Sequence, residues 1–125
     1  GAHDAVRLAR EALGGLDAVI HTVGGFSGGP RLEATGLADA HLMMNLNYWS
    51  AFHLAQAVLP VFTAQSTGRF VAIGALAAGT QPPGLAAYAA SKAALRSLVR
   101  SIAHENKNSG ITANLISPGT MDTPA

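Results

Sequence analysis

Three short apolar segments stand far apart in this chain, and their spacing restricts the fold more than any other feature. They are residues 17–23 (DAVIHTV), 70–73 (FVAI) and 111–116 (ITANLI). Each has the length of a buried strand and is followed by glycine, serine or proline. The segments between them are far too long for hairpins, so crossovers should connect neighbouring strands in parallel, with the right-handed sense that such connections take. The spacing therefore predicts an α/β fold.

Helices are predicted in the intervening segments. Residues 2–13 have apolar side chains at amphipathic spacing, and two glycines end the pattern. A long helix, or two abutting ones, is expected from Thr35, as the N-cap, to Phe62, with Pro60 kinking or ending it. A further helix is expected over residues 85–106, after a loop at 74–84.

The number and order of these elements indicate part of a larger fold. A doubly wound sheet is normally covered by helices on both faces and has more than three strands. The order here also begins in the middle of a strand-helix-strand unit. We therefore expect residues 1–125 to form a partial Rossmann-type doubly wound parallel sheet of about three strands with crossover helices.

The composition excludes several classes of protein. The 125 residues are 49% hydrophobic and 12% charged, which is enough apolar material for a core and argues against disorder. A net charge of +1 with scattered basic residues predicts neither a nucleic-acid partner nor a membrane partner. The lack of cysteine and of a signal-peptide pattern favours the cytoplasm, and the histidines have no metal-ligand spacing, so no metal is expected.

Tyr88 and Lys92 are the side chains best suited to chemistry. They stand four residues apart at the start of the last predicted helix, so both project from one face. A phenol is a poor acid or base at neutral pH, but a nearby ammonium favours the phenolate. Taken alone, such a pair is more often packing beside a solvated charge, so the surrounding sequence has to decide.

The surrounding sequence resembles the short-chain dehydrogenase/reductase family. The pair lies in GLAAYAASKAALRSLVRSIAHE, which is followed by SGITANLISPGTMDTP, and the family's motifs recur in order from Leu16 to Thr123. The resemblance implies an oxidoreductase that uses NAD or NADP on a small-molecule substrate. It also implies that the chain is the C-terminal half of a single NAD(P)-binding domain, without the N-terminal half that carries the nucleotide loop.

The resemblance assigns roles to individual residues. Tyr88 matches the catalytic tyrosine, and Lys92 matches the lysine that hydrogen-bonds the nicotinamide ribose and favours the tyrosinate. Asn47 matches the helix asparagine that holds a water in the proton relay, with Asn45 as the competing register. The backbone N–H of Met121 matches the one that bonds the carboxamide. The expected cofactor contacts are Thr22, Val23, Gly24, Tyr88, Lys92, Pro118, Gly119, Met121 and Thr123.

Two positions depart from the family pattern. Ala75 occupies the place of the catalytic serine, so no hydroxyl polarises a carbonyl from there, and Thr80 is expected in the wrong part of the loop to replace it. A missing oxyanion donor typically costs about 10²–10³ in rate. The segment from His21 to Gly24 stands where Asn-Asn-Ala-Gly is usual, and His21 is expected to be a core or loop histidine rather than a ligand.

Both departures make the chain similar to the dihydropteridine reductase branch of the family. The segment VGGFSGG of this chain resembles the glycine-rich segment of that branch. A quinonoid pterin is already polarised, so a tyrosine donor can suffice for its reduction. The expected substrate is thus a carbonyl or alcohol, or a pterin-like ring. The alternative is a serine-less, non-catalytic fragment that acts as a binding or oligomerisation unit.

A homo-oligomer, most simply a dimer, is expected through the helices at 35–62 and 85–106. The second of these is rich in alanine, which permits close helix approach, and the corresponding helices of the family commonly form a four-helix interface.

Overall fold

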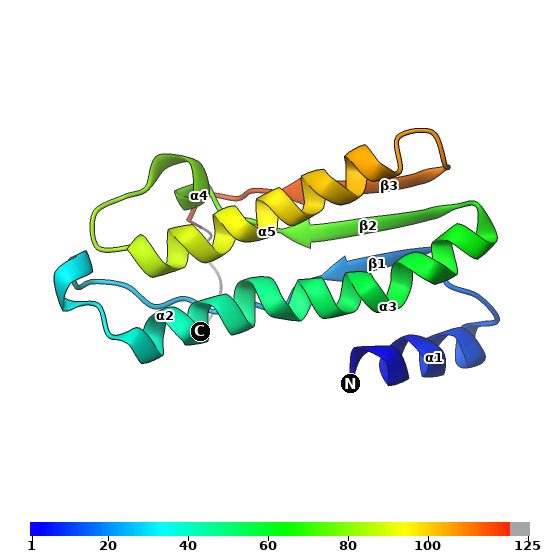
Figure 1. Ribbon diagram of the computed structural model, residues 1–125, viewed down its shortest axis with the longest axis horizontal. Helices are drawn as coiled ribbons and strands as arrows, with labels where there is room; N and C mark the ends of the chain where they lie inside the picture. The colour runs from blue at the N-terminus through cyan, green and yellow to red at the C-terminus, as the bar shows by residue number, and fades with distance from the viewer. Residues whose placement is uncertain (121–125) are drawn as a thin grey trace.

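The computed structural model describes residues 1–120, which contain a three-stranded parallel sheet (Figure 1). Its strands are β1 (Ala18–His21), β2 (Gly68–Ile73) and β3 (Ile111–Ile116), and β2 lies between the other two. Ala18 pairs with Arg69, and Gly68 pairs with Ile111. The predicted α/β class and parallel sheet are confirmed.

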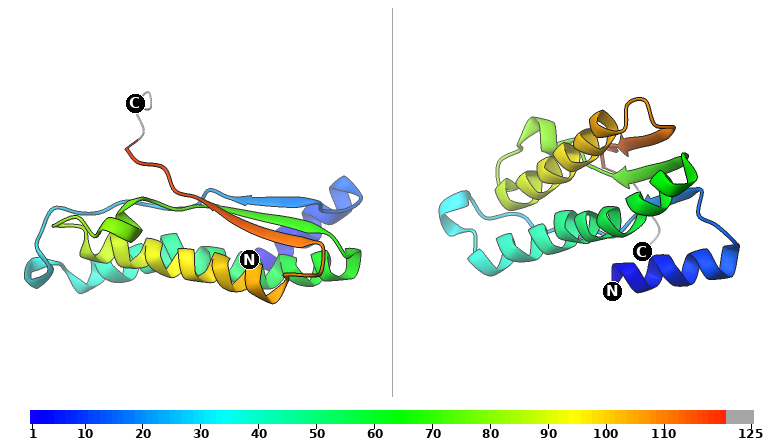
Figure 2. Two further views of the ribbon diagram at one scale, coloured as in Figure 1. Left: turned by 90° about the horizontal axis from the view of Figure 1, so that it is seen from above. Right: turned by 45° about the vertical axis from the view of Figure 1, so that its right-hand side comes forward.

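Helices fill the segments between the strands. They are α1 (Ala2–Leu13), the 3-10 helix η1 (Leu32–Ala34), α2 (Leu37–Met44), the π-helix η2 (Asn45–Trp49), α3 (Ser50–Gln65), α4 (Ala77–Thr80) and α5 (Ala86–Glu105). Seen from above, α3 and α5 form a layer against one face of the sheet (Figure 2). Helix α1 packs beside α3.

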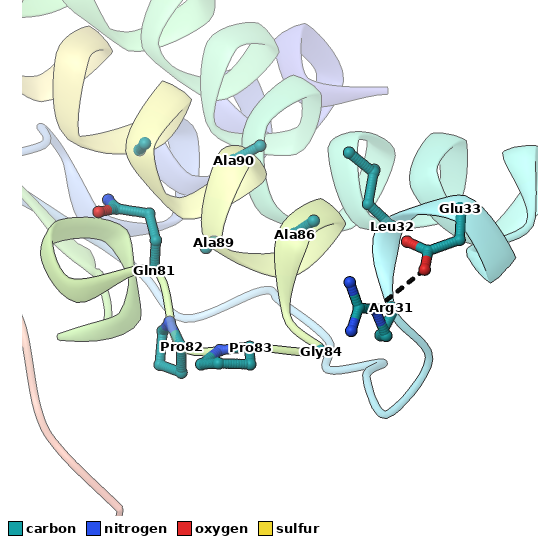
Figure 3. A pocket seen from close by; sticks show the side chains of 11 residues that line it. Arg31, Leu32, Glu33, Gln81, Pro82, Pro83, Gly84, Ala86, Ala89 and Ala90 are labelled. Atoms are coloured by element: carbon teal, nitrogen blue, oxygen red, sulfur yellow. Dashed lines mark ion pairs between the residues drawn. The ribbon is translucent and has the colours of Figure 1, made fainter.

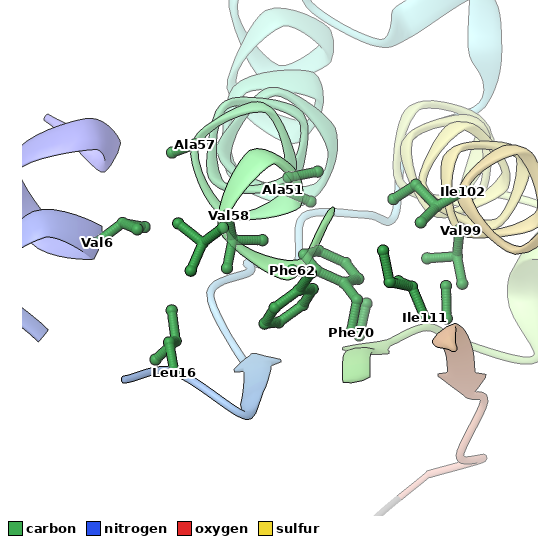
Figure 4. Packing of buried hydrophobic residues seen from close by; sticks show 14 of the residues in the cluster. Val6, Leu16, Ala51, Ala57, Val58, Phe62, Phe70, Val99, Ile102 and Ile111 are labelled. Carbon is green, nitrogen blue, oxygen red and sulfur yellow. The ribbon is translucent and has the colours of Figure 1, made fainter. Parts of the chain in front are cut away.

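The core lies between that helical layer and the sheet. The rings of Phe62 on α3 and Phe70 on β2 are fully buried and adjacent (Figure 4). Gly68 is required beneath them, because a Cβ added there would lie 2.1 Å from Phe62 Cγ. Aliphatic side chains of α1, α5 and β3 complete the cluster, among them Val6, Leu95, Val99, Ile102 and Ile111.

The opposite face of the sheet is open within residues 1–120, where no helix packs against it (Figure 2). Ile20 of β1 is 65% exposed and Ile116 of β3 is 56% exposed on this open face. A doubly wound sheet buries both faces, so the fold supports the expectation of a partial doubly wound domain. None of the helices in the described part of the chain is long and apolar enough to cross a membrane.

The structure differs at two points from the sequence-based expectations about the long helix. Gly36, not Thr35, is the N-cap of α2, because the Thr35 hydroxyl donates to Arg31 O of the preceding turn. Pro60 does not end α3, which continues to Gln65. An internal proline costs a helix about 3 kcal/mol, but burial of Val61 and Phe62 just beyond it offsets this cost.

Candidate active site

A pocket of about 780 Å³ opens at the carboxyl ends of the three strands. Thr22 and Gly24 line it after β1, Ala75 after β2, and Pro118 and Gly119 after β3. This edge is where parallel α/β sheets bind their ligands. The pocket therefore brings together residues that the sequence separates by most of its length.

Tyr88 and Lys92 both line this pocket from the first turns of α5. Lys92 is 6% exposed, and its ammonium donates to Ile73 O at the end of β2, 3.0 Å away. Burial lowers the pKa of Lys92, because the charged form loses hydration. An ammonium has three N–H donors, so two remain for other acceptors in the pocket.

Asn47 is buried completely in the π-helix η2 and ties three elements together. Its side-chain oxygen accepts from the Gly25 N–H at 2.9 Å. Its Nδ2 donates to Gly25 O at 3.0 Å and to the Ser91 hydroxyl at 3.0 Å. The side-chain amide thus fastens the loop after β1 to α5, and it does not itself line the pocket.

The structure distinguishes the two asparagines that the sequence left as alternatives. Asn45, the alternative residue, is exposed, whereas Asn47 faces the interior beside Gly24. A Cβ added at Gly24 would lie 2.9 Å from the Asn47 oxygen and 3.4 Å from Lys92 Nζ. Only a glycine fits comfortably between these two polar groups.

A π-helix in this position is a feature that the sequence did not predict. The Ser50 N–H reaches back five residues to Asn45 O. Such single-turn bulges occur frequently at functional sites. Apolar periodicity detects a helix here but cannot show a change in its hydrogen-bond spacing.

Ala75 lines the pocket with Tyr88, so the serine position of the family lies where a substrate oxygen could reach it. Thr80 lines the same pocket from the end of α4, and the expectation that it does not replace the serine stays a prediction. Its hydroxyl donates to Leu76 O at 3.2 Å.

Phe26 is a pocket residue that sequence reasoning did not single out. Its ring meets the Tyr88 ring edge to face, with centroids 4.9 Å apart and planes at 72°. Phe26 is nevertheless 67% exposed. A large aromatic ring held at the mouth of a pocket is available to pack on a ligand. Its position in the aromatic VGGFSGG segment was the available signal.

The expected cofactor contacts are only partly gathered in the pocket. Thr22, Gly24, Pro118 and Gly119 line it together with the Tyr-Lys pair, and so does Thr120, which sequence analysis did not name. Val23 is 54% exposed and does not line the pocket. Met121 and Thr123 lie outside the described residues.

A separate pocket of about 680 Å³ lies beyond the first turns of α5 (Figure 3). Its walls include Pro82, Pro83 and the small side chains of Ala86 and Ala90. An exposed Arg31–Glu33 ion pair of 2.9 Å borders it (Figure 3). Tyr88 and Lys92 do not line it, so the paired acid-base groups belong to the first pocket alone. Residues 1–120 contain no group of three or more acidic or histidine side chains arranged to hold a metal.

Comparisons with known proteins identify similar sequences and structures. The sequence profile of the family described as enoyl-(acyl carrier protein) reductase matches residues 2–125. The 7α-hydroxysteroid dehydrogenase of Escherichia coli K12 is 35% identical over 113 residues, which are 90% of this chain and 44% of that protein. The 2,3-dihydro-2,3-dihydroxybenzoate dehydrogenase of the same organism is 36% identical over 108 residues, covering 86% and 43% of the two chains.

Solved structures show the same fold. NAD⁺-bound xylitol dehydrogenase superimposes with a TM-score of 0.93 at 27% identity, over 98% of this chain and 47% of that one. NADP-bound ElxO, at 23% identity and a TM-score of 0.91, shares the fold over 94% of this chain and 48% of its own. The chain thus spans less than half the length of these relatives, and its sheet is part of a Rossmann-type domain. It belongs to the short-chain dehydrogenase/reductase family.

Proposed function

We propose that this chain carries the proton-transfer half of an NAD(P)H-dependent oxidoreductase site. The observation that carries the proposal is that Tyr88 and Lys92 share one helix face and one pocket at the carboxyl ends of the strands. The residues present fit a nicotinamide nucleotide. Gly24 leaves room for close backbone approach, and Lys92 has N–H donors left for a ribose.

The chain's own residues would handle the proton. The bound nicotinamide cofactor supplies the hydride that forms the new C–H bond. Tyr88 donates its phenolic proton to the substrate heteroatom, and the Lys92 ammonium stabilises the tyrosinate left behind. The Asn47 side chain makes hydrogen bonds to Gly25 and Ser91, so Asn47 holds the loop after β1 and α5 in place.

The acceptor we favour is a planar, already polarised ring of the pterin-like class. Ala75 offers no hydroxyl to polarise a plain carbonyl. Phe26 presents an exposed aromatic ring beside Tyr88, where a flat substrate could stack. An ordinary carbonyl or alcohol is the second substrate class, and it would need another hydroxyl, for which Thr80 lines the same pocket.

The test uses the full protein with Tyr88→Phe, which removes the phenolic proton and leaves the ring in place. We expect NAD(P)H oxidation with a quinonoid pterin to fall by about 10²–10⁴, the usual contribution of a general acid. Tyr48→Phe is the matched control, because Tyr48 lies on η2 away from the pocket. Unchanged oxidation in Tyr88→Phe with every acceptor tried would refute the proposed role.

A non-catalytic binding or oligomerisation unit is the second candidate function, and Ala75 is the observation that favours it. Isothermal titration with NADH and NADPH separates the two functions, because a non-catalytic unit has no need to bind either nucleotide. Micromolar binding that is weakened in Lys92→Met supports the oxidoreductase.

A further inference from the structure

His21 is the last residue of β1, and its side chain is buried between the sheet and the helical layer, with 3% exposed. Its Nε2 lies 2.9 Å from the Ser50 hydroxyl, and that hydroxyl lies 2.6 Å from Leu46 O. A carbonyl can only accept, so the single hydroxyl proton of Ser50 goes to Leu46 O. Nε2 must therefore carry a proton and donate it to Ser50.

This tautomer leaves Nδ1 of His21 with a lone pair and no partner. Within residues 1–120 it is the one buried side-chain nitrogen or oxygen that makes no hydrogen bond to the protein. An unsatisfied buried polar atom costs about 1–3 kcal/mol. Native proteins usually satisfy such atoms with an ordered internal water.

Among the described residues, Lys92 has N–H donors without an acceptor, whereas His21 Nδ1 is an acceptor without a donor. Its ammonium is buried, and Ile73 O is its one recorded acceptor in the described part of the chain. His21 and Ile73 end neighbouring parallel strands, where His21 pairs with Ala72. The unpaired acceptor, His21 Nδ1, and the unpaired N–H donors of Lys92 therefore lie at the same end of the sheet.

The charge of Lys92 also acts on the His21 imidazole. Burial lowers the pKa of His21, the positive charge of Lys92 lowers it further, and the residue's own backbone acts in the opposite direction. Lys92 is the one charged side chain among the described residues that contributes to this change. The imidazole therefore stays neutral and able to accept a proton in a hydrogen bond.

We propose that a buried water bridges His21 Nδ1 and Lys92 Nζ, so that His21 acts as a positioning residue for the ammonium. The water donates one proton to Nδ1, and its oxygen accepts one from Nζ. Together with Ile73 O, this water fixes two of the three ammonium protons and directs the third toward the pocket. The inference deepens the proposed function, in which Lys92 serves Tyr88, but it can be tested without any turnover.

Two substitutions of His21 separate its two nitrogens. His21→Asn keeps a side-chain oxygen near the position of Nδ1 and loses the bond to Ser50. His21→Gln keeps an amide near the position of Nε2 and loses the acceptor. His21→Asn is therefore the matched control, because it also loses the bond to Ser50 but keeps an acceptor.

The measurement is the Lys92 pKa, read by NMR titration of the full protein labelled at the lysine side-chain carbons. Lys92 and Lys107 are the two lysines of this chain, and the exposed Lys107 is an internal reference. We expect His21→Asn to keep the wild-type Lys92 pKa and His21→Gln to lower it, because the buried ammonium loses an acceptor. An unchanged pKa in His21→Gln, or an equal fall in His21→Asn, overturns the bridge.

A second arm needs no variant. In wild-type protein with ¹⁵N-labelled histidine, the bridge predicts a protonated Nε2, a hydrogen-bonded and unprotonated Nδ1, and a cross-peak from a long-lived water to the ring. A protonated Nδ1, or the absence of that cross-peak, overturns it. Failure of the bridge leaves the Tyr88→Phe result intact, and a silent Tyr88→Phe leaves the Lys92 titration intact, so the two proposals fail separately.

Discussion

At the scale of single residues, the proposed acceptor class depends on the hydroxyl groups around Tyr88. Ala75 contributes none, and the Thr80 hydroxyl already donates to Leu76 O. A substrate carbonyl would therefore have to compete with a backbone oxygen for the Thr80 proton. This arrangement favours acceptors that need little polarisation from the protein.

Ala75→Ser restores a hydroxyl at the family's serine position. Ketone reduction by the full protein should rise, up to about the 10²–10³ that one oxyanion donor supplies. Steady-state rates with a simple ketone check this, with Ala86→Ser as the control, since Ala86 lines the other pocket. Unchanged or lower rates would mean that position 75 is not oriented toward the substrate oxygen.

The pH dependence of stability follows from His21. Its pKa is lowered in the folded chain from the 6.5 of an unperturbed histidine. Above that value both states carry a neutral imidazole, so the His21 contribution is fully present. As the pH falls below 6.5, the unfolded chain binds the proton first, so the free energy of unfolding declines until the folded-state pKa is passed.

Urea unfolding at pH 7.5 and at pH 5 measures this decline, and His21→Asn, which cannot titrate, should show less of it. The comparison is made as a difference between the two proteins, so that contributions common to both cancel. An equal decline in both proteins would contradict the assignment to His21.

At the scale of elements, the π-helix η2 controls where the loop after β1 lies. Three hydrogen bonds from one side chain, that of Asn47, connect Gly25 and Ser91 through this bulge. The loop carries Gly24 and Phe26 into the pocket. The position of this loop therefore depends on a side chain of η2.

Asn47→Ala should lower the free energy of unfolding by about 1–3 kcal/mol, since it leaves buried backbone groups unpaired. It should also weaken nucleotide binding, because the loop loses its anchor. Asn45→Ala is the matched control, since that side chain is exposed. Urea unfolding and isothermal titration check both effects, and equal losses in the two variants would count against the anchoring role.

The sequence predicted the elements better than their junctions. The helix at 2–13 and the strand at 111–116 have the predicted bounds, because their apolar periodicity and flanking glycines are local signals. Continuation past Pro60 depends on burial of Phe62 against β2. The bulge at Asn47 depends on its partners on other elements, so neither could be found from local pattern.

At the scale of the whole molecule, α3 and α5 present a shared outer groove of about 490 Å³. Tyr48 and Phe52 line it from one side, and Ala94, Ser97 and Ser101 line it from the other. Aromatic side chains facing small ones suit close helix packing. We propose that the expected homo-oligomer forms here.

Ser97→Glu places a charge in that groove and should convert a dimer of the full protein into monomers, because an unpaired charge is costly to bury. Sedimentation velocity measures the shift, and Asn108→Glu, at an exposed position outside the groove, is the control. A wild-type protein that sediments as a monomer at high micromolar concentration would reject the interface.

The sequence by itself determined the fold class, the order of strands and helices, and the shared face of Tyr88 and Lys92, because periodicity and i, i+4 spacing are properties of neighbouring residues. Only the tertiary structure decided that Asn47 rather than Asn45 is buried, that Phe26 and Thr80 join the pocket, and that His21 is buried without a hydrogen-bond partner for Nδ1 within residues 1–120. Those relations link residues on different strands and helices. They arise when parallel strands bring their carboxyl ends together, a step that no local pattern encodes.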